Sequence, residues 1–242
     1  MSQKVRGANR LFDIAGCTWC VNLDTLAGMA GWPILDVLEA EEARGVLAAA
    51  RRRTYRRGEV VFHRDDPADT MHLVRSGCLA ARVTTPLGDV ATLQLLGPGQ
   101  SFGEVALLRP GHVRTATVEA LGPAETYALS KRDLDQLRGS HPEIVDHLLQ
   151  LMADRVAELT DRLVEALYTP APQRVRRMLD GLAERYGEPG GDAVIPLTQD
   201  DLAGLAGTSR LTVNRALQEM RRRGQVELSR GRIRIVGTPT GG

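Results

Sequence analysis

Two neighbouring stretches decide the fold of this chain: Phe102-Gly103-Glu104-Val105-Ala106-Leu107-Leu108 and Arg114-Thr115-Ala116-Thr117. Gly103 has no Cβ, so the backbone can approach a ligand closely there. The apolar run after Glu104 favours a short helix or turn, whose first N–H groups are free to bind an anion. Arg114 adds a permanently charged, forked donor, and Thr115 adds a hydroxyl. Because the carboxylate of Glu104 does not bind an anion, a sugar hydroxyl is its expected partner. Together these groups predict a site for a cyclic sugar phosphate.

The segments on either side of this site alternate between apolar and polar residues, which is typical of strands. Five strands are expected between residues 54 and 130, at Val60–Phe62, Met71–Val74, Leu79–Val83, Val90–Leu96 and Thr115–Val118. Gly and Pro residues separate these segments and mark the turns. Short strands at this spacing predict an all-β sandwich or barrel.

Helices are expected before the strands and after them. Spaced apolar residues from about 22 to 53 indicate short helices, and Arg51, Arg52 and Arg53 are expected to face solvent at the edge of the sheet. A longer helix, about 40 Å in length, is predicted over residues 142–168. Its apolar residues recur at spacings of three and four: Leu149, Met152, Val156, Leu159, Leu163 and Ala166. This heptad seam favours pairing with a second copy of the chain over packing on the sheet. Pro170 and Pro172 end the helix and form a hinge.

Two short helices joined by a tight turn are predicted beyond the hinge. Thr198, with Asp201 three residues later, is an N-cap pattern for the first helix. Gly207 closes that helix, and Ser209 can cap the second. A β-hairpin is expected over residues 226–236. The pattern predicts a winged helix-turn-helix.

Composition is that of an ordinary globular protein, and the length suggests one large domain or two modest ones. The 242 residues are 43% hydrophobic and 25% charged. Residues 171–242 contain twelve Arg and eight acidic residues, a net charge of +4, whereas residues 1–170 carry −3. This asymmetry indicates a nucleic-acid partner at the C-terminal end. There is no apolar run of about 20 residues and no signal-peptide core, so a cytoplasmic protein without a membrane partner is expected.

The three cysteines are Cys17, Cys20 and Cys78. An odd number argues against a secreted disulfide scaffold. Cys17 and Cys20 have the C-x-x-C spacing of a metal knuckle or a redox pair, but zinc and iron–sulfur sites require four ligands. No metal is therefore expected, although a redox or iron–sulfur sensor that uses these cysteines remains the alternative. No other catalytic constellation accompanies them, so an enzyme is not expected.

The order of these features resembles the CRP/FNR family of bacterial transcription regulators over roughly residues 22–236. Three segments match the β-roll of the family: Arg57–Val60, Leu73–Gly77 and Gly97–Glu104. A fourth, Arg210-x-Thr-Val-x-Arg215, matches its recognition helix. The resemblance implies an α+β protein in four parts: an N-terminal extension with the C-x-x-C over residues 1–21, a cyclic-nucleotide-binding β-roll over 22–141, a dimerisation helix over 142–169 and a winged helix DNA-binding domain over 170–242. It also implies a homodimer that binds palindromic double-stranded DNA and contacts RNA polymerase.

The resemblance assigns the contacts to the sugar and the phosphate by position. In the family the Glu binds the ribose 2′-hydroxyl, the Arg binds the cyclic phosphate, and the residue after the Arg assists. These residues are Glu104, Arg114 and Thr115 in this sequence, with Gly103 and Val105 as backbone donors.

The base contacts depart from the family pattern. Members that bind cAMP place two hydroxyl residues of the long helix against the adenine. The matching positions are Leu159 and Thr160, so only Thr160 retains a hydroxyl. The resemblance therefore implies cAMP as the allosteric effector, with cGMP as the alternative.

The resemblance also assigns a set of DNA contacts: Thr198, Thr208, Ser209, Arg210, Leu211, Thr212 and Arg215. Arg210 and Arg215 match base-reading positions, and Ser209 and Thr212 match phosphate-contacting ones. Many members carry Glu in place of Leu211, and that Glu accepts a hydrogen bond from cytosine. Leucine cannot accept one, so a weaker preference is expected at that base.

Overall fold

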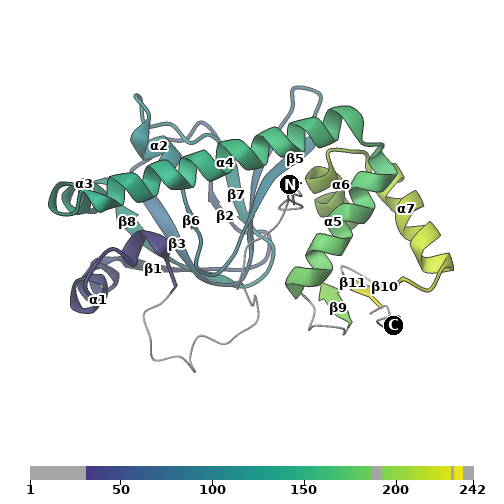
Figure 1. Cartoon of the computed structure of the whole chain (residues 1–242), viewed down its shortest axis with the longest axis horizontal. Helices are drawn as coiled ribbons and strands as arrows, with labels where there is room; N and C mark the ends of the chain where they lie inside the picture. Colours follow the sequence, from purple (N-terminus) through teal and green to yellow (C-terminus); the bar gives the residue numbers. More distant parts are fainter. Residues whose placement is uncertain (1–30, 187–191, 230–231, 237–242) are drawn as a thin grey trace, which may run out of the picture.

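The computed structural model describes residues 31–186, 192–229 and 232–236. The C-x-x-C of Cys17 and Cys20 and the first expected apolar positions therefore lie outside the described residues. A long helix, α4, joins a sheet-rich N-terminal domain to a smaller C-terminal domain of helices and short strands (Figure 1). The α+β fold class predicted from the sequence is confirmed.

The N-terminal domain consists of two four-stranded antiparallel sheets with short helices around them. Their orders are β1-β8-β3-β6 and β2-β7-β4-β5 in the described part of the chain. The strands are β1 Arg51–Tyr55, β2 Val60–Phe62, β3 Thr70–Ser76, β4 Leu79–Thr84, β5 Val90–Leu96, β6 Ser101–Phe102, β7 Thr117–Ala120 and β8 Ala124–Ser130. The helices are η2 Pro33–Leu35, α1 Ala40–Ala49, α2 Glu104–Leu108 and α3 Lys131–Ser140.

Apolar residues from facing strands hold the two sheets together. Val74, Leu79, Leu96, Phe102 and Val118 form one buried cluster between them. A second cluster lies under the surrounding helices and includes Trp32, Met71, Leu129, Ile144 and Leu148. Because Ile144 and Leu148 belong to the first turns of α4, this cluster fixes the start of the long helix on the N-terminal domain.

Helix α4 spans Glu143–Tyr168, close to the predicted range. Beyond its first two turns the predicted apolar seam faces outward, because Leu149, Val156, Leu159 and Leu163 are 54–65% exposed. Helix α5, Ala171–Tyr186, begins almost directly after α4. The predicted hinge is therefore reduced to Thr169 and Pro170.

The C-terminal domain continues with β9 Ala193–Ile195, α6 Gln199–Ala206, α7 Arg210–Arg222, β10 Val226–Ser229 and β11 Arg232–Ile235. The predicted caps are present: Thr198 and Asp201 form a capping box on α6, and the Ser209 hydroxyl accepts from the Thr212 N–H on α7. Gly207 ends α6 with a φ of 56°, in the left-handed region where glycine is favoured. Strand β9, which the sequence did not suggest, pairs with β11 and makes the wing a three-stranded sheet.

The two domains share a hydrophobic core. Cys78, Ala80, Leu95 and Leu121 of the N-terminal domain belong to the same buried cluster as the apolar residues of α5, α6 and α7. Figure 1 shows α6 beside β5, where this cluster lies. The C-terminal domain is thus packed directly on strands of the N-terminal domain.

Other expectations can be compared with the described residues. Arg51, Arg52 and Arg53 lie exposed on β1, at the edge of its sheet, as the sequence analysis expected. Strand β8 and helix α3 were not anticipated. No helix among the described residues combines the length and the apolar content that a membrane span requires.

Candidate functional site

The turn between β6 and α2 depends on Gly103. Its φ of 89° lies in the left-handed region. A Cβ at this position would lie 2.8 Å from Nη1 of Arg114 and 3.2 Å from the carbonyl oxygen of Thr70. Glycine is therefore required both for the backbone turn and for the close approach of Arg114.

Arg114 is almost completely buried, at 3% exposed. Its Nη1 donates to the Thr70 carbonyl at 2.7 Å, and its Nη2 donates to the Thr70 hydroxyl at 2.9 Å. The guanidinium carbon lies 4.0 Å from the centre of the Phe62 ring, within the range of a cation–π contact. Burial lowers the pKa of Arg114, and the carboxylate of Asp69, 3.9 Å away, opposes that shift. Neutral partners thus supply most of the contacts to this buried cation, an arrangement suited to an anionic ligand.

Glu104 is the buried carboxylate next to this turn, with no exposed surface. Its Oε1 forms an ion pair with Arg155 of α4, and Arg155 also donates from Nη2 to the Ser101 carbonyl at 3.1 Å. The other carboxylate oxygen, Oε2, has no hydrogen-bond partner among the described residues. A buried acceptor without a donor is costly, so Oε2 favours a hydrogen-bond donor that the described residues do not supply.

A cavity of about 200 Å³ lies beside these groups. Several residues predicted to bind the ligand line it: Gly103, Val105, Arg114, Thr115 and Leu159. Its other walls are mainly apolar, and Arg155 and Glu158 add charge from α4. The cavity therefore combines a mainly apolar lining with a few charged groups, Arg114 among them, which suits a ligand with an anionic group and a flat ring.

Two of the residues predicted to bind the ligand, Glu104 and Thr160, are not among those that line the cavity. Glu104 lies between two residues that do line it, Gly103 and Val105. Thr160 follows the lining residue Leu159 on α4. Its hydroxyl donates to the Val156 carbonyl, one turn earlier in its own helix, at 2.8 Å. The structure thus places Leu159 at the cavity and Thr160 on the exposed surface of α4.

His72 lies beside Arg114 without acting as a second cation. Burial, together with the charge of Arg114, lowers its pKa to about 3. The ring stacks on Phe102, with centroids 4.9 Å apart, and its Nδ1 lies 3.1 Å from the Thr126 hydroxyl. His72 is therefore neutral near pH 7, and the guanidinium groups supply the positive charge of the site.

The predicted DNA contacts gather around the start of α7. Arg210 and Leu211 are well exposed, at 68% of the side chain and 58% of the residue, and Ser209 and Arg215 are exposed as well. Thr208 and Thr212 are half-buried, and the Thr212 hydroxyl lies 3.0 Å from that of Ser209. Thr198 is committed to the cap of α6. The two exposed arginines, Arg210 and Arg215, lie in the first two turns of α7.

Comparisons with known proteins match two parts of the chain to domain families. Residues 52–141 match the cyclic nucleotide-binding domain, and residues 173–238 match the Crp-like helix-turn-helix domain. A CRP-like cAMP-activated global transcriptional regulator of Mycobacterium tuberculosis is 32% identical over 71% of this chain and 78% of its own length. The cyclic AMP receptor protein of Thermus thermophilus is 33% identical over 86% of this chain and 94% of its own.

The chain belongs to the CRP/FNR family.

Solved structures of CRP/FNR-type regulators show the same fold. The catabolite activator protein of T. thermophilus is 33% identical and aligns with a TM-score of 0.51 over 84% of this chain and 93% of that one. The regulator CLP of Xanthomonas campestris, described as c-di-GMP responsive, has a TM-score of 0.72 at 24% identity, over 83% of this chain and all of that one. At that identity the likeness concerns the fold alone. The family consists of transcription regulators, and this chain has its cyclic-nucleotide-binding and DNA-binding domains.

Two charged residues of this CRP/FNR chain were missed as site residues. Arg155 and Glu158 both line the cavity, although their sequence positions suggested only the flank of a helix seam. Arg155 stands 51 positions from Glu104, and no local pattern connects the two. Asp200 was missed in the same way, and its carboxylate lies 3.2 Å from the guanidinium of Arg210.

The metal-sensing alternative is not tested by the described residues. No group of three or more His, Cys, Asp or Glu residues in the described ranges could hold a metal ion. Cys78 is buried in the core between the domains, with its Sγ 3.7 Å from the Leu79 carbonyl. Cys17 and Cys20 fall outside those ranges.

Proposed function

We propose that this protein is a homodimeric transcription regulator whose binding to DNA is controlled by cAMP. The observation that carries the proposal is the pairing of a buried, cationic Arg114 with the unpartnered Oε2 of Glu104 beside one cavity. A cyclic ribose phosphate presents the anion and the hydroxyl that these two groups require. The names of the M. tuberculosis and T. thermophilus relatives, both of which specify cAMP, support this choice.

Each part of the nucleotide has a proposed partner in the cavity. Arg114 and Thr115, with the backbone N–H groups of Gly103 and Val105, hold the cyclic phosphate. Oε2 of Glu104 accepts from the ribose hydroxyl. The base lies against Leu159, which lines the cavity.

A cGMP-responsive regulator is the second candidate, and Glu158 is the observation that favours it. Glu158 lines the cavity, one residue before Leu159. A carboxylate can accept from both N–H donors on the edge of guanine, whereas adenine offers one donor beside an acceptor. The ion pair between Glu158 and Arg162, at 2.6 Å, competes with this role.

The exposed face of α4 supports dimerisation. Val156, Leu159, Leu163 and Leu167 are 54–66% exposed along one side of the helix. A stripe of this kind is stable in water when a second helix covers it. Because Leu159 also lines the cavity, the second copy would lie next to the bound base.

The C-terminal domain is proposed to bind a palindromic operator in the cytoplasm. Arg210 and Arg215 each suit a guanine, and the Leu211 side chain suits a thymine methyl group. We place the domain boundaries at residues 22–141, 142–169 and 170–242, with RNA polymerase as a further partner. The N-terminal extension over residues 1–21 has no assigned role.

Calorimetric titration of the full chain with cAMP and with cGMP tests the proposal. We expect cAMP to bind the wild-type protein, and Arg114→Ala to weaken binding at least about ten-fold, since a charge-assisted contact is lost. Arg109→Ala removes an exposed arginine from the same loop and serves as the matched control. Equal affinity in the Arg114→Ala protein would refute the site. Tighter binding of cGMP would favour the second candidate.

A further inference from the structure

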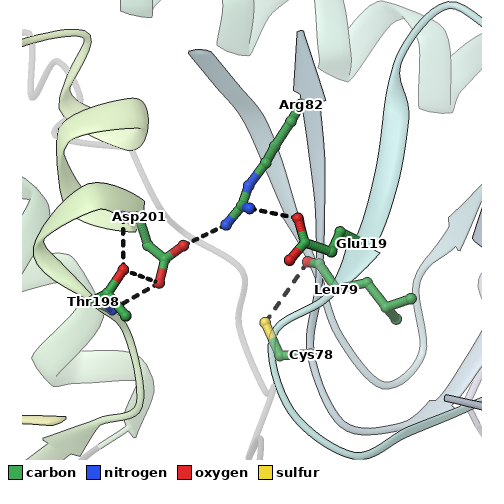
Figure 2. A network of polar contacts seen from close by, with 6 residues as sticks. All are labelled: Cys78, Leu79, Arg82, Glu119, Thr198 and Asp201. Atoms are coloured by element: carbon green, nitrogen blue, oxygen red, sulfur yellow. Dashed lines mark hydrogen bonds and ion pairs between the residues drawn. The ribbon is translucent and has the colours of Figure 1, made fainter. Parts of the chain in front are cut away.

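An ion pair between Arg82 and Asp201 connects the N-terminal domain to the C-terminal domain. Arg82 of β4 binds Glu119 of β7 at 2.7 Å with Nη1 and the carboxylate of Asp201 on α6 with Nη2. Figure 2 shows Arg82 between these two carboxylates, with Asp201 reaching from the C-terminal domain. The side chains of Arg82 and Asp201 are only 17% and 12% exposed, so the pair is largely shielded from water.

Asp201 also holds the first turn of α6. Its Oδ2 accepts from both the backbone N–H and the hydroxyl of Thr198, each at 2.7 Å (Figure 2). One carboxylate therefore both caps α6 and binds the N-terminal domain. Any shift of Arg82 acts directly on the first helix of the helix-turn-helix.

A close backbone contact accompanies the ion pair. Gly204 of α6 lies so near β5 that a Cβ would stand 2.8 Å from the Thr92 hydroxyl and 2.9 Å from the Val90 carbonyl. Glycine is thus what allows α6 to lie on this strand.

The same strand forms a wall of the cavity. Ala81 pairs with Gln94 and Arg82 with Thr92, so Leu93 is the extra residue of a β-bulge and stands next to the partner of Arg82. Leu93 lines the cavity, and its carbonyl accepts from Nη1 of Arg162 on α4 at 2.5 Å. The bulge therefore touches the cavity, α4 and the strand position that carries Arg82.

We propose that the bulge at Leu93 and the Arg82–Asp201 ion pair form the route by which the cavity controls the position of the helix-turn-helix. A ligand that contacts Leu93 changes the bulge, and with it the placement of Arg82 and of the β5 surface under Gly204. Because the ion pair is largely shielded from water, separating Arg82 from Asp201 loses a charge-assisted contact that solvent does not readily replace, so intermediate positions are disfavoured. This inference rests on the proposed cyclic-nucleotide control and adds the residues that transmit it.

The test measures coupling, as the ratio of the DNA dissociation constants without and with cAMP. The probe is a fluorescent duplex enriched from random DNA by the wild-type full chain, read by anisotropy. For the wild type we expect a ratio of at least about five, the lower end of typical allosteric coupling. Arg82→Gln removes the ion pair and leaves the cap on α6 intact. Gly204→Ala separates the surfaces by steric contact and leaves the ion pair residues unchanged.

Both variants should bring the ratio to within about two-fold of one while still binding cAMP in calorimetry. Arg52→Gln, which removes an ion pair to Glu125 inside the N-terminal domain, and Gly45→Ala, which meets nothing within 4 Å, should keep the wild-type ratio. If both test variants keep the ratio of the wild-type protein, the proposed route is refuted while the proposed control by cAMP stands. A wild-type protein that binds cAMP but shows a ratio of one would overturn the proposed switch and the route with it.

Discussion

The buried environment of His72 predicts how the stability of the protein depends on pH. Its pKa is lowered from the ordinary 6.5 to about 3 in the folded protein, chiefly because the ring is buried. At pH values between about 3 and 6.5, His72 is protonated in the unfolded chain and neutral in the folded chain. The contribution of His72 to stability is therefore present above pH 6.5 and is lost as the pH falls toward 3.

Replacing His72 with Phe should remove this dependence and keep a ring against Phe102. The difference in the free energy of unfolding between the wild type and His72→Phe should change by up to roughly 1.4 kcal/mol per pH unit below pH 6.5. Urea denaturation at pH 5, 6 and 7 measures it. A difference that stays constant across these pH values would show that His72 titrates normally in the folded state.

Single residues also show how far a sequence can predict a site. Gly103, Arg114 and Thr115 stand close together in the chain, so their spacing alone indicated a common site. Arg155 reaches Glu104 only because the first turns of α4 are fixed on the sheet by Ile144 and Leu148. No local pattern contains that information, because the contact depends on where α4 lies on the sheet.

At the scale of elements, Arg174 joins the ends of two helices. Its guanidinium donates to carbonyls at the end of α4, Ala166 at 3.4 Å and Thr169 at 2.8 Å. It also donates to carbonyls at the end of α6, Ala206 at 3.0 Å and Gly207 at 2.9 Å. Terminal carbonyls need such donors, and a cation at helix C-termini is favourable.

Arg174→Ala should therefore destabilise the chain by about 1–3 kcal/mol, because several charge-assisted hydrogen bonds are lost together. The urea midpoint followed by circular dichroism gives the measurement. Arg177→Ala, three residues along the same helix, removes an exposed side chain whose ion pair with Glu165 is 3.5 Å long, and should cost little. Equal losses in the two variants would contradict the special role of Arg174.

Elements with strong local signals were predictable, and those stabilised by pairing were not. The caps of α6 and α7 and the range of α4 followed from residue type and period. Strand β8 was missed because the residues it buries are mainly small or polar, such as Ala124, Thr126 and Ala128. Its strand conformation comes from pairing with both β1 and β3. Helix α3 does begin with a capping box, Ser130 with Asp133, which could have indicated it.

At the scale of the whole molecule, the exposed stripe on α4 predicts the oligomeric state. Leu163 is 59% exposed and does not line the cavity. Leu163→Glu should leave each subunit folded and separate the dimer, because pairing would bury an uncompensated charge. Light scattering at micromolar concentration should give a dimer for the wild type and a monomer for the variant. A monomeric wild type would refute pairing through α4.

The packing of the two domains against one another could not be predicted from the sequence. Arg82 and Gly204 look like an ordinary strand arginine and a helix-weakening glycine when only their neighbours are considered. Their roles appear once α6 lies on β5, since each is explained by a contact with the other domain. Contacts between segments that lie far apart in the sequence leave little trace in local periodicity.

The most direct test of the whole account is a selection from random double-stranded DNA by the full chain, with and without cAMP. Helix-turn-helix dimers, the catabolite activator protein among them, bind half-sites about 34–36 Å apart. We predict palindromic winners with at least one strongly preferred G in each half, read by Arg210 or Arg215, and a weak preference at the base opposite Leu211. Enrichment should be stronger with cAMP. Winners without symmetry, or without a preferred G, would contradict the account of α7, and identical enrichment without cAMP would contradict its role as the effector.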